Sequence, residues 1–123
     1  MQHPNFFILY VNDPLASAAF YAQLLGRPAV EAAPTFAMFA LESGVMLGLW
    51  SRHTVEPAAS AGGGGAEVAI ALESVDEVTA THQRWLSLGL PVIQAPTQMD
   101  FGYTFVATDP DGHRLRVFAA NRD

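Results

Sequence analysis

The chain repeats one arrangement of elements twice, and this repetition limits the possible fold more than any other feature of the sequence. The first half begins with an apolar segment typical of a strand, residues 6–11, and continues with a helical pattern over residues 13–26. The second half begins with a similar segment, residues 67–72, followed by a helical pattern over residues 76–89. Both helical patterns start at an aspartate, end at a glycine and have the same length, so we interpret the two halves as an internal duplication.

A tight turn predicts how the last two strands of the second half pair. The residues at 109–112 are Asp-Pro-Asp-Gly, with proline where a type I turn accepts it and glycine where the backbone becomes left-handed. This is the pattern of a three-residue hairpin loop. The loop sets the register, which places Val106 opposite Arg116 and Thr104 opposite Phe118.

The first half contains a looser version of the same turn. Its residues at 42–44 are Glu-Ser-Gly, between two segments with strand-like alternation. By analogy, this hairpin places Met38 opposite Gly48 and Phe36 opposite Trp50.

Period-two alternation divides the strand residues into two faces. One face is uniformly apolar, and we predict that the helices cover it to form the core: Phe7, Leu9, Val11, Ala37, Phe39, Leu41, Val45, Leu47, Leu49, Val68, Ile70, Leu72, Tyr103, Phe105, Leu115 and Val117. The other face mixes aromatic and polar side chains: Phe6, Ile8, Tyr10, Phe36, Met38, Met46, Gly48, Trp50, Glu67, Ala69, Thr104, Val106, Arg114, Arg116 and Phe118. Such a mixture is typical of the wall of a small-molecule pocket.

These patterns predict an α+β fold of two βαβββ units. We expect facing, partly closed mixed sheets around a cleft, with the helices on the outer faces. The length of 123 residues indicates a single domain, 1–123. Within it we place unit one at about 5–50 and unit two at about 67–119. Residues 51–66 include four consecutive glycines, which indicates a flexible linker or, alternatively, a mobile flap over the cleft.

Composition excludes several classes of protein. The net charge is -6 and all six basic residues are arginine, which argues against a nucleic-acid partner. The chain has no cysteine, which excludes disulfides, a thiolate nucleophile and a zinc ribbon. The apolar runs are too short to span a bilayer, so we expect a cytoplasmic protein without a membrane partner. The four histidines have no spacing that suggests a metal cluster, and no phosphate-binding loop is present.

The repeated unit and the Asp-Pro-Asp-Gly-His turn resemble the vicinal oxygen chelate superfamily, which includes glyoxalase I, fosfomycin and bleomycin resistance proteins and extradiol dioxygenases. The resemblance spans nearly the whole chain. Within the superfamily, short segments resemble the phenazine antibiotic resistance branch, at residues 49–51, 56–57, 101–105 and 109–117.

Members of this superfamily that use a metal place its ligands on the first and last strands of each unit. The resemblance assigns those places to Phe6, Gly48, Glu67 and Arg116. Phenylalanine and glycine offer no ligand, and arginine is a permanent cation. We therefore expect no metal and no other cofactor.

If the half-sheets face each other as in the family, Glu67 and Arg116 would approach across the old metal position and pair. Arg116 could also bind a ligand carboxylate in a bidentate manner.

The leading hypothesis is a metal-free homodimer that sequesters a planar aromatic antibiotic such as a phenazine, which makes it a binding protein without turnover and not an enzyme. The first alternative is a metal-dependent lyase, transferase or dioxygenase, and the second is a scaffold domain without a ligand. Trp50 is the strongest candidate for stacking, although it could instead pack in a dimer interface. The predicted ligand-binding residues, with no catalytic or metal-ligating residue, are Trp50, Phe36, Phe6, Met38, Met46, Gly48, Glu67, Thr104, Val106, Arg116 and Phe118.

Overall fold

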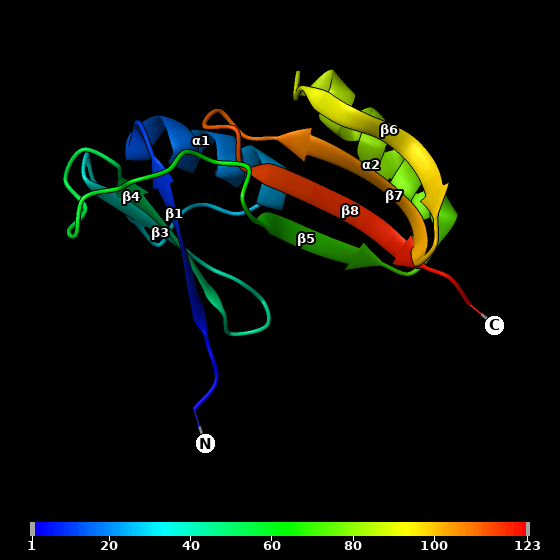
Figure 1. The fold of residues 1–123 in the computed structure, drawn as a ribbon, viewed down its shortest axis with the longest axis horizontal. Coiled ribbons are helices and arrows are strands. Elements are labelled where there is room, and N and C mark those ends of the chain that lie inside the picture. Colours follow the sequence, from blue (N-terminus) through cyan, green and yellow to red (C-terminus); the bar gives the residue numbers. More distant parts are fainter. Residues whose placement is uncertain (1, 123) are drawn as a thin grey trace. The chain divides into compact units, whose positions relative to one another are not determined.

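The computed structural model describes residues 2–122, which form two compact units. The first unit ends at Gly62 and the second begins at Gly63. Each unit contains one helix and one four-stranded sheet in the order βαβββ (Figure 1). The predicted α+β class with two mixed sheets is therefore confirmed. The interpretation of residues 1–123 as a single domain stays a prediction.

The first unit builds a sheet with strand order β1-β4-β3-β2. Strand β1 pairs with β4 in parallel, and the other pairs are antiparallel. The elements are β1 (Phe6–Val11), α1 (Pro14–Leu25), β2 (Glu31–Ala32), β3 (Phe36–Ala40) and β4 (Met46–Ser51).

The second unit repeats this topology with strand order β5-β8-β7-β6. Strand β5 pairs with β8 in parallel, and β8 and β6 flank β7 in antiparallel pairs. The elements are β5 (Glu67–Leu72), α2 (Val75–Ser87), β6 (Val92–Met99), β7 (Gly102–Thr108) and β8 (Arg114–Ala120).

Both helices begin and end where local chemistry favours it. The side chain of Asp13 accepts hydrogen bonds from two backbone N–H groups at the start of α1, and Ser74 does the same for one N–H group of α2. Gly26 and Gly89 follow the two helices with φ of 69° and 86°, a conformation that favours glycine. Among residues 2–122, no helix is long and apolar enough to cross a membrane.

The hairpin turns set the registers that the sequence predicted. In the second unit the backbone N–H of Gly112 donates to the carbonyl of Asp109 over 3.1 Å. Thr104 then pairs with Phe118 and Val106 with Arg116. All four residues hold the predicted positions.

In the first unit the equivalent hydrogen bond joins Gly44 and Leu41 over 3.0 Å. The predicted pairs are confirmed here as well: Phe36 lies opposite Trp50 and Met38 lies opposite Gly48.

Each helix packs on one face of its own sheet, and the apolar strand residues there form the core. Helix α1 packs on β2, β3 and β4, and α2 packs on all four strands of its sheet (Figure 1). In the second unit, the ring centroid of Trp85 lies 5.4 Å from that of Phe105 in an edge-on contact. Buried members of the predicted core are Val11, Ala37, Phe39, Leu47, Leu49, Phe105, Leu115 and Val117.

Phe7 is an exception, and its assignment to the core was wrong. Its side chain is 54% exposed. Strand β1 is at the edge of its sheet, whereas α1 packs on the other three strands. Alternation predicts which face a side chain occupies, but the position of the helix decides how much of that face is covered.

The glycine-rich segment between the units contacts the second unit closely at one position. A Cβ atom added to Gly63 would lie 2.7 Å from the backbone nitrogen of His113 and 2.8 Å from the carbonyl oxygen of Asp111. Only glycine allows the backbone to approach the Asp109–Gly112 turn this closely. The backbone at Gly63 therefore lies directly against the turn. The interpretation of residues 51–66 as a linker or a flap stays a prediction.

Candidate ligand-binding site

The predicted site residues fall into two groups, one on each sheet. Phe6, Phe36, Met38, Met46, Gly48 and Trp50 belong to the first unit, and Glu67, Thr104, Val106, Arg116 and Phe118 belong to the second.

In the first unit, three aromatic side chains gather around Gly48 on β4. A Cβ atom on Gly48 would lie 2.9 Å from both Cζ of Phe36 and Cε1 of Phe6, so the rings occupy the space that a side chain would fill. Trp50 lies edge-on to Phe36, with ring centroids 6.2 Å apart. We call Phe6, Phe36, Gly48 and Trp50 the aromatic face.

The strand pairing explains why these side chains meet. Phe36 and Trp50 are directly opposite each other on β3 and β4, and Met38 is opposite Gly48. Met46 is paired with Phe6 across the parallel β1–β4 contact. Both methionines are half-buried beside the aromatic face, where a flexible thioether can adapt to the shape of a neighbour.

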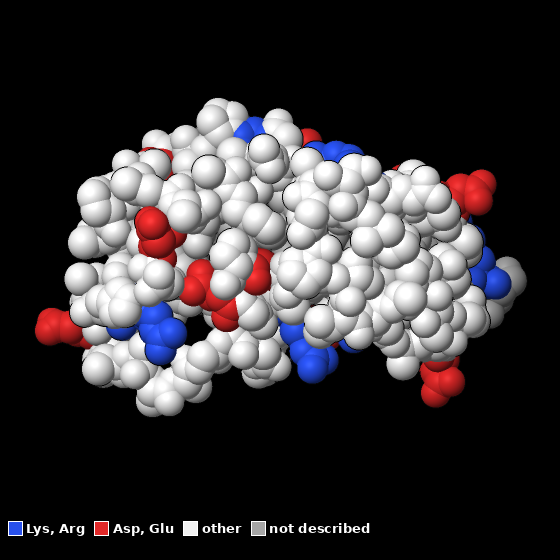
Figure 2. Space-filling view, turned by 90° about the horizontal axis from the view of Figure 1, so that it is seen from above, with Lys and Arg blue, Asp and Glu red and all other residues white. Residues whose placement is uncertain are grey.

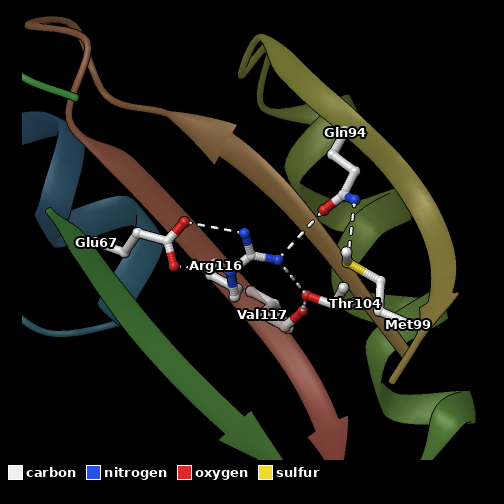
Figure 3. Close-up of polar contacts among 6 residues, drawn as sticks. All are labelled: Glu67, Gln94, Met99, Thr104, Arg116 and Val117. Atoms are coloured by element: carbon white, nitrogen blue, oxygen red, sulfur yellow. Dashed lines mark hydrogen bonds and ion pairs between the residues drawn. The ribbon is translucent and has the colours of Figure 1, made fainter. Parts of the chain in front are cut away.

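In the second unit, a hydrogen-bond network is centred on the guanidinium of Arg116 (Figure 3). Its Nε lies 2.8 Å from Oε1 of Glu67, and its Nη2 lies 3.0 Å from Oε2 of the same carboxylate. Its Nη1 donates to Oε1 of Gln94 over 3.2 Å and to Oγ1 of Thr104 over 3.1 Å. We call Glu67, Gln94, Thr104 and Arg116 the polar centre.

The pairing of Glu67 with Arg116 is confirmed, but the expected route was wrong. The two residues lie on the adjacent parallel strands β5 and β8 of one sheet, where Glu67 is paired with Arg114, two residues before Arg116. The side chains of Glu67 and Arg116 therefore reach each other diagonally along one face. The ion pair does not bridge the two half-sheets.

The Glu67–Arg116 ion pair of the polar centre is more shielded from water than the Arg122–Glu73 ion pair. The side chains of Arg116 and Glu67 are 19% and 31% exposed, whereas those of Arg122 and Glu73 are 70% and 85% exposed. On the face of the molecule drawn in Figure 2, charged side chains are scattered among uncharged atoms. Water and dissolved ions screen an exposed ion pair, so a partly buried ion pair keeps its geometry better than one on such a surface.

The ion pair shifts the titration of both partners. The hydrogen bonds from Arg116 lower the pKa of the Glu67 carboxyl below its ordinary value, against the opposing effect of partial burial. The bond to Glu67 in turn raises the pKa of Arg116. Both groups are therefore charged at neutral pH.

Two predicted site residues, Thr104 of the polar centre and its neighbour Val106, are fully buried on β7. The hydroxyl of Thr104 accepts from Arg116 and donates to the carbonyl of Val117 over 2.9 Å. Thr104 thus helps to hold Arg116 in place.

Sequence reasoning missed three residues in this part of the second unit, namely Gln94, Met99 and Phe101. The amide of Gln94 on β6 accepts from Arg116 and donates to the sulfur of Met99 over 3.3 Å. Phe101 is in the turn after β6, and its ring centroid lies 5.9 Å from Cζ of Arg116 and 5.7 Å from the centroid of Phe118. A polar residue on a strand with apolar neighbours is the signal that could have indicated Gln94.

The residues that the family resemblance assigns to the metal positions do not fit a divalent metal ion. Phe6 and Gly48 have no donor atom, and both oxygens of Glu67 accept hydrogen bonds from a cation, Arg116. Among residues 2–122, no group of three or more histidine, aspartate or glutamate side chains is placed to hold a metal ion. Catalytic metal sites usually have three protein ligands.

Comparisons with known proteins agree with this fold. The family model of the Glyoxalase/Bleomycin resistance protein/Dioxygenase superfamily matches residues 3–117. The phenazine antibiotic resistance protein EhpR of Enterobacter agglomerans is 30% identical over 117 residues, which is 93% of this chain and 89% of that protein.

Two solved structures extend the comparison. A solution NMR structure of an Agrobacterium tumefaciens protein is 53% identical, with a TM-score of 0.91 over 99% of this chain and 100% of that one. A crystal structure of a glyoxalase/bleomycin resistance protein/dioxygenase from Nocardioides is 26% identical, with a TM-score of 0.81 over 98% of this chain and 84% of that one. The chain belongs to the Glyoxalase/Bleomycin resistance protein/Dioxygenase superfamily.

Proposed function

We propose that this protein binds a planar aromatic small molecule of the phenazine antibiotic type and gives resistance by sequestering it without chemical change. The observation that carries the proposal is the aromatic face, where Phe6 and Phe36 pack over Gly48 beside Trp50. The relative that is 30% identical and named as a phenazine antibiotic resistance protein supports this class of ligand.

The proposed affinity follows from stacking and burial. Each aromatic contact contributes about 0.5–1.5 kcal/mol beyond the burial of apolar area. Two or three such contacts, together with apolar burial, are enough for binding at about micromolar concentration. Phe6 is 41% exposed and supplies free ring surface.

We also propose that binding needs no metal. The alternative, a metal-dependent lyase, transferase or dioxygenase, requires ligands that Phe6 and Gly48 do not provide. Elemental analysis of protein purified without chelator discriminates between the two. The proposal expects far less than one equivalent of zinc, manganese, nickel or iron per chain, and a stoichiometric transition metal would favour the enzyme.

The assembly and location form a further part of the proposal. We propose a cytoplasmic homodimer with no nucleic-acid or membrane partner. Apolar side chains on the edge strand β1 support self-association, because Phe7 and Ile8 are 54% and 44% exposed. Light scattering at micromolar protein concentration tests the dimer, and a monomer mass would exclude it.

Isothermal titration calorimetry tests the binding function itself. A panel of flat aromatics, led by phenazine and substituted phenazines, is titrated into protein treated with EDTA and into untreated protein. The proposal expects saturable binding of at least one compound with the same affinity in both samples, and unchanged compound recovered afterwards. Absence of binding across the panel would overturn it.

A further inference from the structure

The strand registers of the first unit place a third aromatic side chain in line with Phe36 and Trp50. Trp50 on β4 is paired with Phe36 on β3 on one side and with Tyr10 on β1 on the other. Residues paired across neighbouring strands have their side chains on the same face of the sheet. Tyr10, Trp50 and Phe36 therefore form one row across three adjacent strands, which we call the aromatic row.

Tyr10 is the most exposed member of the aromatic row. It is 41% exposed, whereas Phe36 and Trp50 are half-buried. Strand β1 is at the edge of its sheet, so the row ends at Tyr10 on this side. A tyrosine combines a large apolar ring with a polar tip, which suits a position between an apolar surface and water.

The neighbouring row on the same face is apolar on these three strands. Gly48 on β4 is paired with Ile8 on β1 and with Met38 on β3. The first charged residue of this second row is the exposed Glu31 on the short strand β2, opposite Met38. On β1, β3 and β4 the affinity for a flat molecule therefore depends on how much of its apolar area these rows cover.

The length of the aromatic row limits the number of rings that it can cover. Neighbouring strands lie about 4.8 Å apart, so Tyr10 and Phe36, which are separated by β4, project from backbones about 10 Å apart. Three six-membered rings fused in a line have about this length. A molecule with two fused rings covers only part of the row and leaves one end without a contact.

We infer that Tyr10 is a ligand-binding residue of the first unit and that it selects the length of the ligand. A molecule of three rings fused in a line binds with its third ring against Tyr10, in preference to a molecule of two rings. This inference rests on the proposed function and adds to it a residue that determines specificity. Tyr10 is outside the set of ligand-binding residues expected from the sequence.

Two probes that differ by one fused ring, quinoxaline and phenazine, test the inference. Their dissociation constants are measured by calorimetry at pH 7 with the full-length wild-type protein. Contact of the third ring with Tyr10 predicts that phenazine binds about tenfold more tightly than quinoxaline. Equal affinities for the two probes would overturn the inference and leave the proposed function standing.

Tyr10→Ala tests whether Tyr10 is the origin of this preference. The variant should bind phenazine about tenfold more weakly and should bind quinoxaline within about twofold of the wild type, so the preference disappears. Tyr10→Phe keeps the ring and should keep the preference. A Tyr10→Ala protein that still prefers phenazine about tenfold would contradict the inference.

Phe7→Ala is the matched control for Tyr10→Ala. Phe7 is an aromatic residue of the same strand and is 54% exposed, but alternation places it on the opposite face of the sheet from Tyr10. The control should therefore keep the preference for phenazine. Loss of the preference in both variants would show that the substitutions disturb β1 as a whole and would contradict a specific role for Tyr10.

The remaining outcomes are also decisive. If neither probe nor any other flat aromatic binds the wild-type protein, the proposed function fails and this inference fails with it. Circular dichroism shows whether Tyr10→Ala is folded. If it is not folded, Tyr10→Leu removes the flat ring but keeps apolar bulk on the strand, and the same loss of preference is expected. If neither variant folds, the comparison of the two probes on the wild-type protein still decides.

Discussion

The Glu67 carboxylate and the Arg116 guanidinium form a two-pronged ion pair, with N–O distances of 2.8 and 3.0 Å, between neighbouring strands of one sheet. Both residues belong to the second unit, so substitution of either residue measures how much the ion pair contributes to the stability of that unit. The corresponding positions of the first unit hold Phe6 and Gly48, as the matching β1–β4 and β5–β8 registers show. The duplicated fold has thus placed an ion pair in one unit and packed aromatic rings in the other.

Arg116→Met should lower the free energy of unfolding by about 1–3 kcal/mol, because Glu67, Gln94 and Thr104 all lose their donor. Urea denaturation measures the change. Arg122→Met is the matched control: its ion pair with Glu73 is exposed, so its effect should stay within about 0.5 kcal/mol. The double variant Glu67→Met/Arg116→Met should recover much of the loss, since no charge is then left unpaired. An Arg116→Met protein as stable as Arg122→Met would contradict this view of the polar centre.

The ion pair also predicts a pH dependence. The pKa of Glu67 is lower in the folded protein than in the unfolded chain, where it is about 4.3. Its contribution to stability is therefore fully present above about pH 4.3 and is lost as the pH falls through the lower folded pKa. The difference in unfolding free energy between wild type and Glu67→Gln should be constant from pH 7 to pH 5.5 and should shrink in more acidic solution. A difference that grows on acidification would show that the sign of the shift is wrong.

Gly48→Ala should disturb the aromatic face. The added methyl group would lie 2.9 Å from ring atoms of Phe6 and Phe36, so both rings must move. The atoms that must move are the outer ends of two side chains, one of them exposed, so we expect a loss of stability at the low end for overpacking, about 1 kcal/mol or less. We also expect weaker binding of flat aromatics. Gly62→Ala is the control, because nothing lies within 4 Å of the position of its Cβ. Thermal denaturation and calorimetry should separate the two variants, and equal behaviour would argue against close packing over Gly48.

Gly63→Ala should detach the glycine-rich segment from the Asp109–Gly112 turn. The new Cβ would meet backbone atoms of Asp111 and His113, which cannot rotate away as a side chain can. We expect a loss of stability of about 1–3 kcal/mol and faster amide hydrogen exchange in the turn. Gly65→Ala has open space around its Cβ and should change neither measurement. Identical exchange in both variants would show that the segment is not held at Gly63.

The fold and the cross-strand pairs could be predicted because local chemistry determines them. The Asp109–Gly112 loop has the composition of one hairpin type, and loop length sets the register of the strands that follow. The pairs Phe36–Trp50 and Thr104–Phe118 follow from the two turns and from alternation alone. The ends of both helices could be predicted for the same reason, because local capping residues mark them.

The residues that were missed depend on contacts between distant segments. Strand β6 pairs with β7 through register shifts around Gln94, so alternation does not predict where the Gln94 side chain points. Phe101 is in a turn, outside any periodic pattern. The ion pair was expected to bridge two sheets because the sequence does not show that β5 and β8 are adjacent in one sheet.

Tryptophan fluorescence during titration with a phenazine tests the central claim most directly, that the aromatic face binds a flat aromatic ligand. Trp50 is half-buried on this face, whereas Trp85 is 1% exposed and packs on Phe105 in the core. After correction for absorption by the ligand, we predict saturable quenching in the native protein and a much smaller effect in Trp50→Phe, where only Trp85 emits. Native emission that does not change at saturating ligand, or quenching that is just as strong in Trp50→Phe, would contradict the account.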